Sequence, residues 1–303
     1  DFRTPMQDNL LWVYEGQTAF WDLVLAARSG MQSKEMVLAE WATHAGFYSI
    51  QPGRAWRSVE DTTLDPIIAA RKARAFPSAT RTEDYYNEGS LMWLEADMLI
   101  RRATNHAKSL DDFARAFFGG REGDWGQSTY DFDDVVAALN AVHPYDWAKF
   151  LHDRMQTSGR PAPTAGIEAA GYRLVWRTAP NAFDRDRMNH SKNSDLTHSL
   201  GLVIDKDGVA GSIVWDGPAF RADIVNGTRI LAVDGVSYSR ERIEAAIRAA
   251  ADGRTPVRLL VERGGRYRTV EIAYHSGLRW PHLEKAGEGP DWFDRLFTAK
   301  RPI

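Results

Sequence analysis

Apolar residues in the first half of the chain recur at the three- and four-residue spacing of amphipathic helices. This spacing predicts a helix from Thr18 to Ser29, ended by Gly30, and a second helix from Lys34 to about Tyr48. Ser33 is a suitable N-cap for the second helix. The same spacing predicts further helices over residues 83–103, 110–119, 132–142 and 144–155.

The pattern changes after a segment rich in Gly and Pro, residues 157–163. Beyond it, apolar and polar residues alternate, which is typical of strands. The polar segment from Asn181 to His198 predicts a loop, and residues 239–251 predict a single helix. Strands are expected over residues 172–176, 200–204, 209–215, 229–233, 257–261 and 269–273.

These patterns predict an α+β protein of two domains. The expected division is a helical portion over residues 1–158, a linker over 159–170, a mainly β domain over 171–275 and an extension over 276–303. Trp280, Trp292 and Phe293 in the extension are candidates for docking against the rest of the protein.

Composition narrows the possible functions. The 303 residues carry 41 acidic and 38 basic side chains, and a net charge of −3 argues against a general nucleic-acid binder. No apolar run approaches the roughly 18 residues of a membrane span. The absence of cysteine excludes disulfides, thiol nucleophiles and cysteine-ligated metals. A periplasmic and a cytoplasmic location both remain open.

The order of motifs in the second half resembles a PDZ domain over residues 171–274. Leu200-Gly201-Leu202 precedes a strand, as the carboxylate-binding loop of that family does. The segment from Gly227 to Gly235 is similar to the family's Gly-Asp-x-Ile-Leu-x-Val-Asn/Asp-Gly signature, with Thr228 in place of the usual Asp. The resemblance implies a mainly β domain that binds the ends of extended peptides.

In such a domain, a peptide adds as a strand to an open sheet edge and inserts a side chain beside a helix. The groove would lie between the strand after Gly201 and the helix of residues 239–251. Alternatively, the chain itself fills this groove. The residues expected to line it are Leu200, Gly201, Leu202, Val203, Ile243 and Ile247.

Two segments of the first half contain residues that could do chemistry. Trp12, Glu15, Gly16 and Thr18 form a Trp-x-x-Glu-Gly-x-Thr pattern. Residues 84–89 read Asp-Tyr-Tyr-Asn-Glu-Gly. From the residues alone, Glu15 is explained as an acid near a helix start, favoured by the helix dipole, and the two tyrosines as packed side chains.

Taken in order, and together with residues 52–54 and 61–65, these segments resemble the glycyl aminopeptidase family of zinc metallopeptidases. These gluzincins have a thermolysin-like helical catalytic domain followed by a PDZ domain. The resemblance implies that Glu15 is a zinc ligand and that Tyr86 stabilises the oxyanion. Tyr85 is the alternative tyrosine, and Glu88 stands where related aminopeptidases carry a lysine.

None of the eight histidines lies in a His-Glu-x-x-His motif, which supplies two zinc ligands and the general base in this family. We therefore expect this chain to be the C-terminal part of a longer zinc aminopeptidase and to be inactive alone. The parent would release N-terminal Gly or Ala from peptides, and the N-terminal part of the same protein would be a partner. The alternative function is a non-catalytic helical and PDZ protein that binds peptides or partners.

Overall fold

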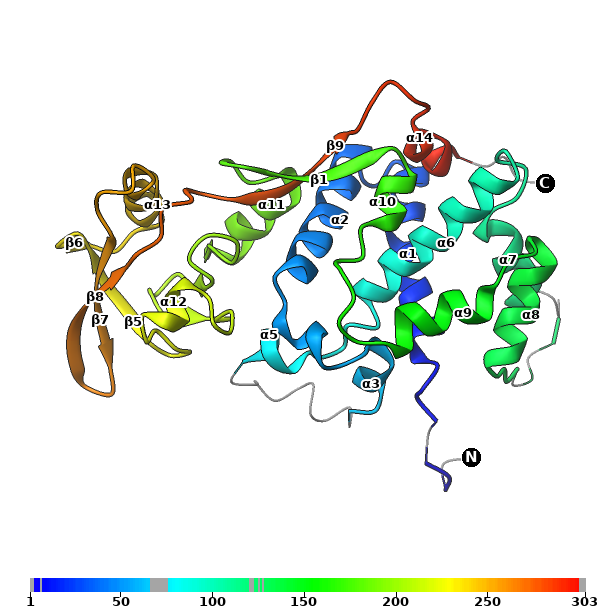
Figure 1. The fold of residues 1–303 in the computed structure, drawn as a ribbon, viewed down its shortest axis with the longest axis horizontal. Helices are drawn as coiled ribbons and strands as arrows, with labels where there is room; N and C mark the ends of the chain where they lie inside the picture. The colour runs from blue at the N-terminus through cyan, green and yellow to red at the C-terminus, as the bar shows by residue number, and fades with distance from the viewer. Residues whose placement is uncertain are drawn as a thin grey trace.

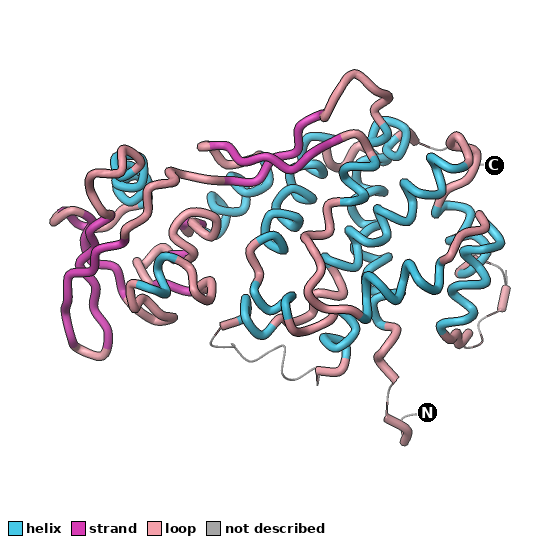
Figure 2. The backbone as a smooth tube through the Cα atoms, in the orientation of Figure 1, coloured by secondary structure: helices cyan, strands magenta, loops and turns pink. Residues whose placement is uncertain are grey.

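The computed structural model describes residues 3–299 apart from residues 6, 66–75, 120–122, 125 and 127. Helices gather at one end of an elongated α+β molecule, and an antiparallel sheet lies at the other end (Figure 1). Long helices dominate the first half of the chain, whereas strands and loops dominate the second half (Figure 2). In the described part of the chain, no helix is both long and apolar enough to cross a membrane.

The expected caps are present at Gly30, Ser33 and Ser109, but the first helix begins at Leu11 and not at the predicted Thr18. Ser33 accepts a hydrogen bond from the Met36 N–H, and Gly30 adopts the left-handed conformation (φ 76°). Ser109 and Asp112 form a capping box. The elements are α1 (Leu11–Ser29), α2 (Lys34–Ser49), η1 (Pro52–Ala55), α3 (Val59–Thr63), α5 (Pro77–Thr80), α6 (Asn87–Ala103), α7 (Leu110–Phe117), α8 (Phe132–Val142), α9 (Trp147–Leu151), the π-helix η2 (His152–Gln156) and α10 (Ala165–Ala169).

The second half holds three antiparallel sheets, of order β1-β9, β2-β3-β4 and β6-β5-β7-β8. Its elements are β1 (Tyr172–Arg177), α11 (Ala182–Ser191), β2 (Ser194–Asp195), β3 (Val203–Ile204), β4 (Ala210–Gly211), α12 (Pro218–Arg221), β5 (Arg229–Val233), β6 (Val236–Ser237), α13 (Arg240–Ala250), β7 (Val257–Arg263), β8 (Arg266–Ile272), β9 (Trp280–Lys285) and α14 (Trp292–Phe297).

The prediction of a loop from Asn181 to His198 is wrong, because α11 occupies most of this segment. Asn181 caps the helix by accepting a hydrogen bond from the Asp184 N–H at 2.7 Å. Its side-chain amide also donates to the Ala39 carbonyl of α2 and to the Pro281 carbonyl of β9. A polar helix with a weak apolar stripe is therefore stabilised by these tertiary contacts.

Buried apolar residues form two clusters. The first lies among the helices of the first half, and the second lies among β3–β8 and α13. The sheet of β1 and β9 contacts α2, and Tyr172 of β1 belongs to the first cluster. The expected docking of Phe293 is confirmed, since its ring lies 5.4 Å from that of Trp41. Strand β1, expected at the start of the second domain, thus joins the helical core.

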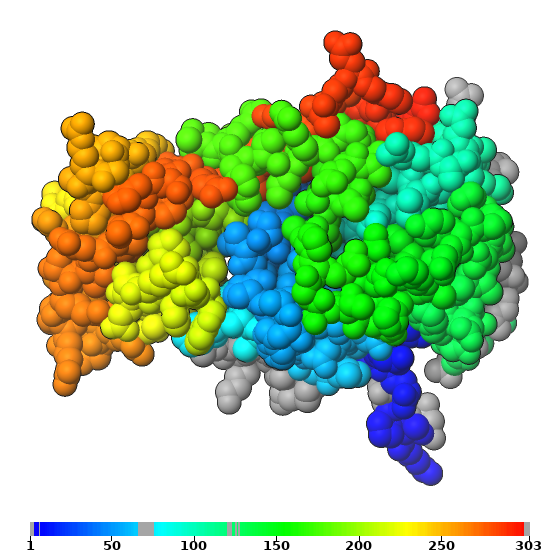
Figure 3. All heavy atoms as spheres, viewed as in Figure 1, coloured from blue at the N-terminus to red at the C-terminus, as the bar shows by residue number. Residues whose placement is uncertain are grey.

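The segment expected as a linker, residues 159–170, is packed against the helical half. The Gly159 N–H donates to the Arg54 carbonyl at 2.7 Å. Gly166 of α10 lies so close to α6 that an added Cβ would be 2.6 Å from the Glu95 nitrogen. The two halves also contact each other elsewhere, for example through the rings of Phe76 and Trp215 at 4.9 Å. Figure 3 shows them meeting along a seam (blue and cyan against yellow).

Peptide addition would require an open sheet edge at residues 200–204, but this edge is closed at Val203–Ile204. Strand β3 is paired on one side by β2 and on the other by β4. The Gly201 N–H, which would face a peptide carboxylate, donates to the Leu196 carbonyl at 3.0 Å instead. The chain itself therefore occupies the edge at which a peptide would add.

Helices α1 and α6 approach each other most closely at Gly16 and Gly89. An added Cβ on Gly16 would lie 3.1 Å from the Gly89 Cα, and one on Gly89 would lie 2.9 Å from the Gly16 Cα. The Trp93 indole N–H donates to the Trp12 carbonyl at 3.2 Å one turn away. Glycine is needed at both positions because the two backbones touch.

We expect Gly89→Ala to lower the free energy of unfolding. A methyl group forced between two backbones destabilises the fold by about 1–3 kcal/mol. The better helix propensity of alanine offsets only about 1 kcal/mol of this loss. Gly16→Ala should have a smaller effect, because its Cβ has 0.2 Å more room (3.1 Å against 2.9 Å). Urea denaturation measures both changes.

Gly211→Ala is the matched control, because an added Cβ there meets nothing within 4 Å. Equal stability of the Gly89 and Gly211 variants would contradict the importance of the helix contact.

Candidate active site

Glu15 and Tyr86, singled out in separate sequence segments, lie side by side in the folded protein. Glu15 projects from the second turn of α1, and Tyr86 is the N-cap residue of α6. The Glu15 carboxylate is close enough to the Tyr86 hydroxyl to raise the pKa of that phenol. Each residue lies within three positions of a glycine at the helix crossing, so the contact of Gly16 with Gly89 brings the pair together.

Both tyrosines of this segment are held in the neutral form. Burial and the nearby Glu15 carboxylate raise the pKa of Tyr86 well above its usual value. Burial, with the charges of Glu83 and Glu15, raises the pKa of Tyr85 to about 12. A neutral phenol keeps its proton near pH 7 and donates a hydrogen bond. Glu15 therefore affects the pKa of both tyrosines.

A buried ion cluster anchors the start of α6. Glu88 pairs with Arg54 at 2.6 Å and also with Arg81. Arg81 pairs in turn with Asp84 at 2.6 Å. Sequence analysis noted Glu88 only as a departure from a family lysine and Arg54 only within the segment of residues 52–54, and it did not identify Arg81. The cluster is hard to recognise from the sequence, because residues as far apart as Arg54 and Glu88 form an ion pair only after folding.

Tyr86 also faces a cleft of about 640 Å³ between the two halves of the protein. Helix α2 contributes His44, and the second half contributes Arg187, His198 and Val203. Of the six residues expected to form the peptide groove, Val203 lines this cleft. Leu200, Leu202, Ile243 and Ile247 are instead fully buried in the second core.

The two histidines of the cleft are held neutral. Burial and the charge of Arg187 lower the pKa of His44 to about 4. Burial likewise lowers the pKa of His198 to about 4, against the opposing effect of Asp195. A ring contact of 4.8 Å with Trp176 encloses His198 further. Because both imidazoles are neutral, Arg187 is the positively charged residue that the second half contributes to this cleft.

The described residues do not by themselves fit a catalytic zinc ion. Such a site needs three protein ligands, usually His together with Glu or Cys. Across the described ranges, no three His, Asp or Glu side chains come together in a way that could hold a metal. Glu15 supplies one carboxylate, and its neighbour Tyr86 is a neutral tyrosine.

The comparison with family models agrees with the peptidase resemblance over part of the chain. Residues 1–92 match the model of the M61 glycyl aminopeptidase family. The fold is similar to the crystal structure of an aminopeptidase N family protein from Idiomarina loihiensis, with a TM-score of 0.70 and 18% identity. That match covers 98% of this chain and 50% of the other, so this chain spans half that protein's length. No curated protein matches the sequence.

Acid should destabilise the protein through the two enclosed histidines. Between pH 6.5 and about 4 the unfolded chain binds protons at His44 and His198, whereas the native protein does not. The free energy of unfolding therefore falls as the pH falls through this window. We expect a double His44→Gln, His198→Gln variant to lose part of this slope in urea denaturation at pH 7 and pH 4.5.

The exposed His190 supplies the control, since His190→Gln should keep the full slope. An unchanged slope in the double variant would show that other groups cause the acid sensitivity.

Proposed function

We propose that this chain is part of a zinc-dependent aminopeptidase that removes small N-terminal residues, Gly or Ala, from peptides. The observation that supports it most is the pairing of Glu15 with Tyr86, which are 71 residues apart in sequence (86 − 15). Two segments that match one family's motif order also meet in space. The match of residues 1–92 to the glycyl aminopeptidase model supports the same function.

In this proposal Glu15 is one zinc ligand, and Tyr86 donates a hydrogen bond to the oxyanion that forms on the scissile carbonyl. A donor held ready in a partly enclosed site stabilises developing negative charge without reorganisation. Tyr86 suits this role because a phenol is protonated near pH 7 and can donate a hydrogen bond. The cleft beside it has room for a short peptide.

The remaining zinc ligands and the general base would come from a part of the parent protein outside these 303 residues, since the sequence has no His-Glu-x-x-His motif. The α1 surface beside Glu15 offers a place for that part. Tyr14, Leu25 and Phe118 are each about half exposed and line an apolar hollow of about 660 Å³ that reaches Tyr86. Exposed apolar patches of this kind mark contact surfaces.

In this proposal the second half serves as a brace for the helical half and as one wall of the cleft. Strand addition is not open to it, because β2 and β4 already pair with β3. Val203 and Arg187 would instead meet the peptide from the side of the cleft opposite Tyr86.

The isolated chain should neither turn over Ala-p-nitroanilide nor retain stoichiometric zinc after dialysis. One carboxylate cannot replace a three-ligand site. Elemental analysis and the absorbance assay check these two points. Tightly held zinc together with turnover would contradict the proposed division of the site between this chain and the rest of the parent.

In the parent protein, Glu15→Gln should lose zinc and activity together. Tyr86→Phe should retain zinc but lower kcat roughly 10²–10³-fold, because a single oxyanion donor is removed. Zinc content and steady-state kinetics distinguish the two effects.

Two variants are controls. Asp133→Asn removes an exposed acid from α8 that lines neither the cleft nor the hollow, and it should keep both zinc and kcat. Tyr85→Phe should also stay active. If Tyr85→Phe loses kcat while Tyr86→Phe keeps it, Tyr85 is the oxyanion donor; if neither matters, the aminopeptidase proposal loses its main support.

A further inference from the structure

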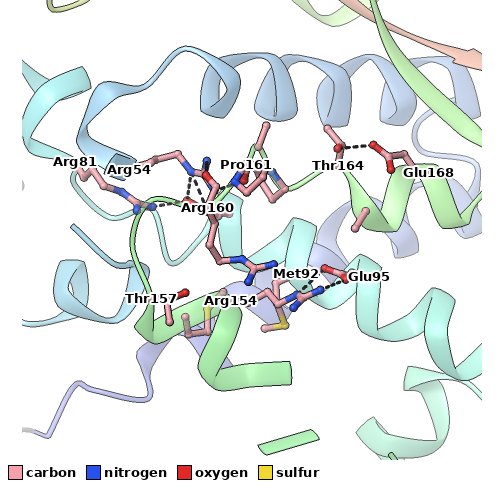
Figure 4. Close-up of a pocket in the computed structure, with 15 residues that line it drawn as sticks. Arg54, Arg81, Met92, Glu95, Arg154, Thr157, Arg160, Pro161, Thr164 and Glu168 are labelled. Carbon is pink, nitrogen blue, oxygen red and sulfur yellow. Dashed lines mark hydrogen bonds and ion pairs between the residues drawn. The ribbon is translucent and has the colours of Figure 1, made fainter. Parts of the chain in front are cut away.

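A second pocket lies on a different face of α6 from the Glu15–Tyr86 pair. Its volume is about 280 Å³, and its walls are α6, the π-helix η2 and the segment of residues 157–165 (Figure 4). None of its lining residues also lines the cleft beside Tyr86. A ligand here would therefore occupy a separate site. Short π-helices such as η2 are rare and are frequent at functional sites.

Most charges around this pocket are already paired. Arg154 binds Glu95 through two hydrogen bonds, with its Nε 3.0 Å from Oε2 and its second nitrogen 2.5 Å from Oε1. Arg54 and Arg81 share the carboxylate of Glu88. These pairs give the pocket a fixed wall.

Arg160 differs from the other three arginines. Its guanidinium forms no hydrogen bond or ion pair with any residue that the structure describes. Its positive charge contributes to lowering the pKa of Asp153. Figure 4 shows its side chain extending from the 157–165 segment into the pocket, toward the Arg154–Glu95 pair. The side chain is partly buried, so water replaces a partner only in part.

The backbone of Arg160 is nevertheless held firmly. The Arg54 guanidinium donates to the carbonyls of Arg160 and Pro161 at 2.9 and 3.0 Å. A cation without a partner thus projects from a backbone that a buried ion cluster fixes. Because the backbone is held, binding of a ligand would have to restrict only the side-chain rotation of Arg160.

We propose that this pocket binds a small oxyanion, the carboxylate or phosphate group of a small molecule, at the guanidinium of Arg160. The planar guanidinium fork matches the two oxygens of either group. Met92 and Met155 provide an apolar surface for the rest of the molecule. The volume is close to the lower end of the range for small-molecule sites, about 300 Å³.

Isothermal titration of the full chain with inorganic phosphate and, separately, with succinate tests the site, with sodium chloride matching the ionic strength. We expect saturable binding of at least one of them. Arg160→Gln should weaken that binding roughly tenfold or more, the loss expected for a charge-assisted hydrogen-bonded pair. The variant should keep the wild-type melting temperature without ligand, because Arg160 makes no contact that folding needs.

Arg254→Gln is the matched control, since it removes the same charge from an exposed site away from the pocket. It should bind as the wild type does. Binding of phosphate alone or of succinate alone identifies which group the site prefers. Absence of saturable binding by both, or equal affinity in the Arg160 and wild-type proteins, would overturn the proposal.

Discussion

The backbone contact between α1 and α6 at Gly16 and Gly89 sets the geometry of the candidate active site. A methyl group at either position would push the helices apart, because the added Cβ would lie only 2.9–3.1 Å from backbone atoms of the facing helix. Glu15 and Tyr86 lie within a turn of these glycines, so their distance depends on how closely the helices approach. The same two glycines therefore determine both the packing of the helices and the position of the candidate catalytic residues. The stacked rings of Trp12 and Trp93 extend the helix contact by one turn.

The buried ion cluster likewise fixes the position of the start of α6. Removing one member of a buried pair costs about 3–5 kcal/mol, because the other charge remains without compensation. Arg54 pairs with Glu88 and also holds two carbonyls of the 157–165 segment. One side chain thus joins η1, α6 and the chain leading to the second half. Arg81 and Glu83 have positive φ angles of 56° and 48°, a conformation that the surrounding ion pairs hold in place.

The second half shows how a local pattern can suggest a groove that folding removes. Residues 200–204 have the alternation and the glycine of a strand that follows a binding loop. Ser194 and Asp195 are polar and too few to be recognised as a strand, yet they pair with Val203 and Ile204. The edge is therefore closed by neighbouring residues, and the available space lies instead between the two halves, where Val203 and Tyr86 face one cleft.

Local patterns in the sequence determined the helix boundaries at Ser33 and Ser109, because caps act through bonds within a few residues. They also singled out Glu15 and Tyr86, because motif spacing is a property of the chain. Only the tertiary structure decided that these two side chains meet, and that α11 forms in a polar segment. Both outcomes depend on contacts between residues far apart in sequence, where close packing and buried hydrogen bonds outweigh local preference.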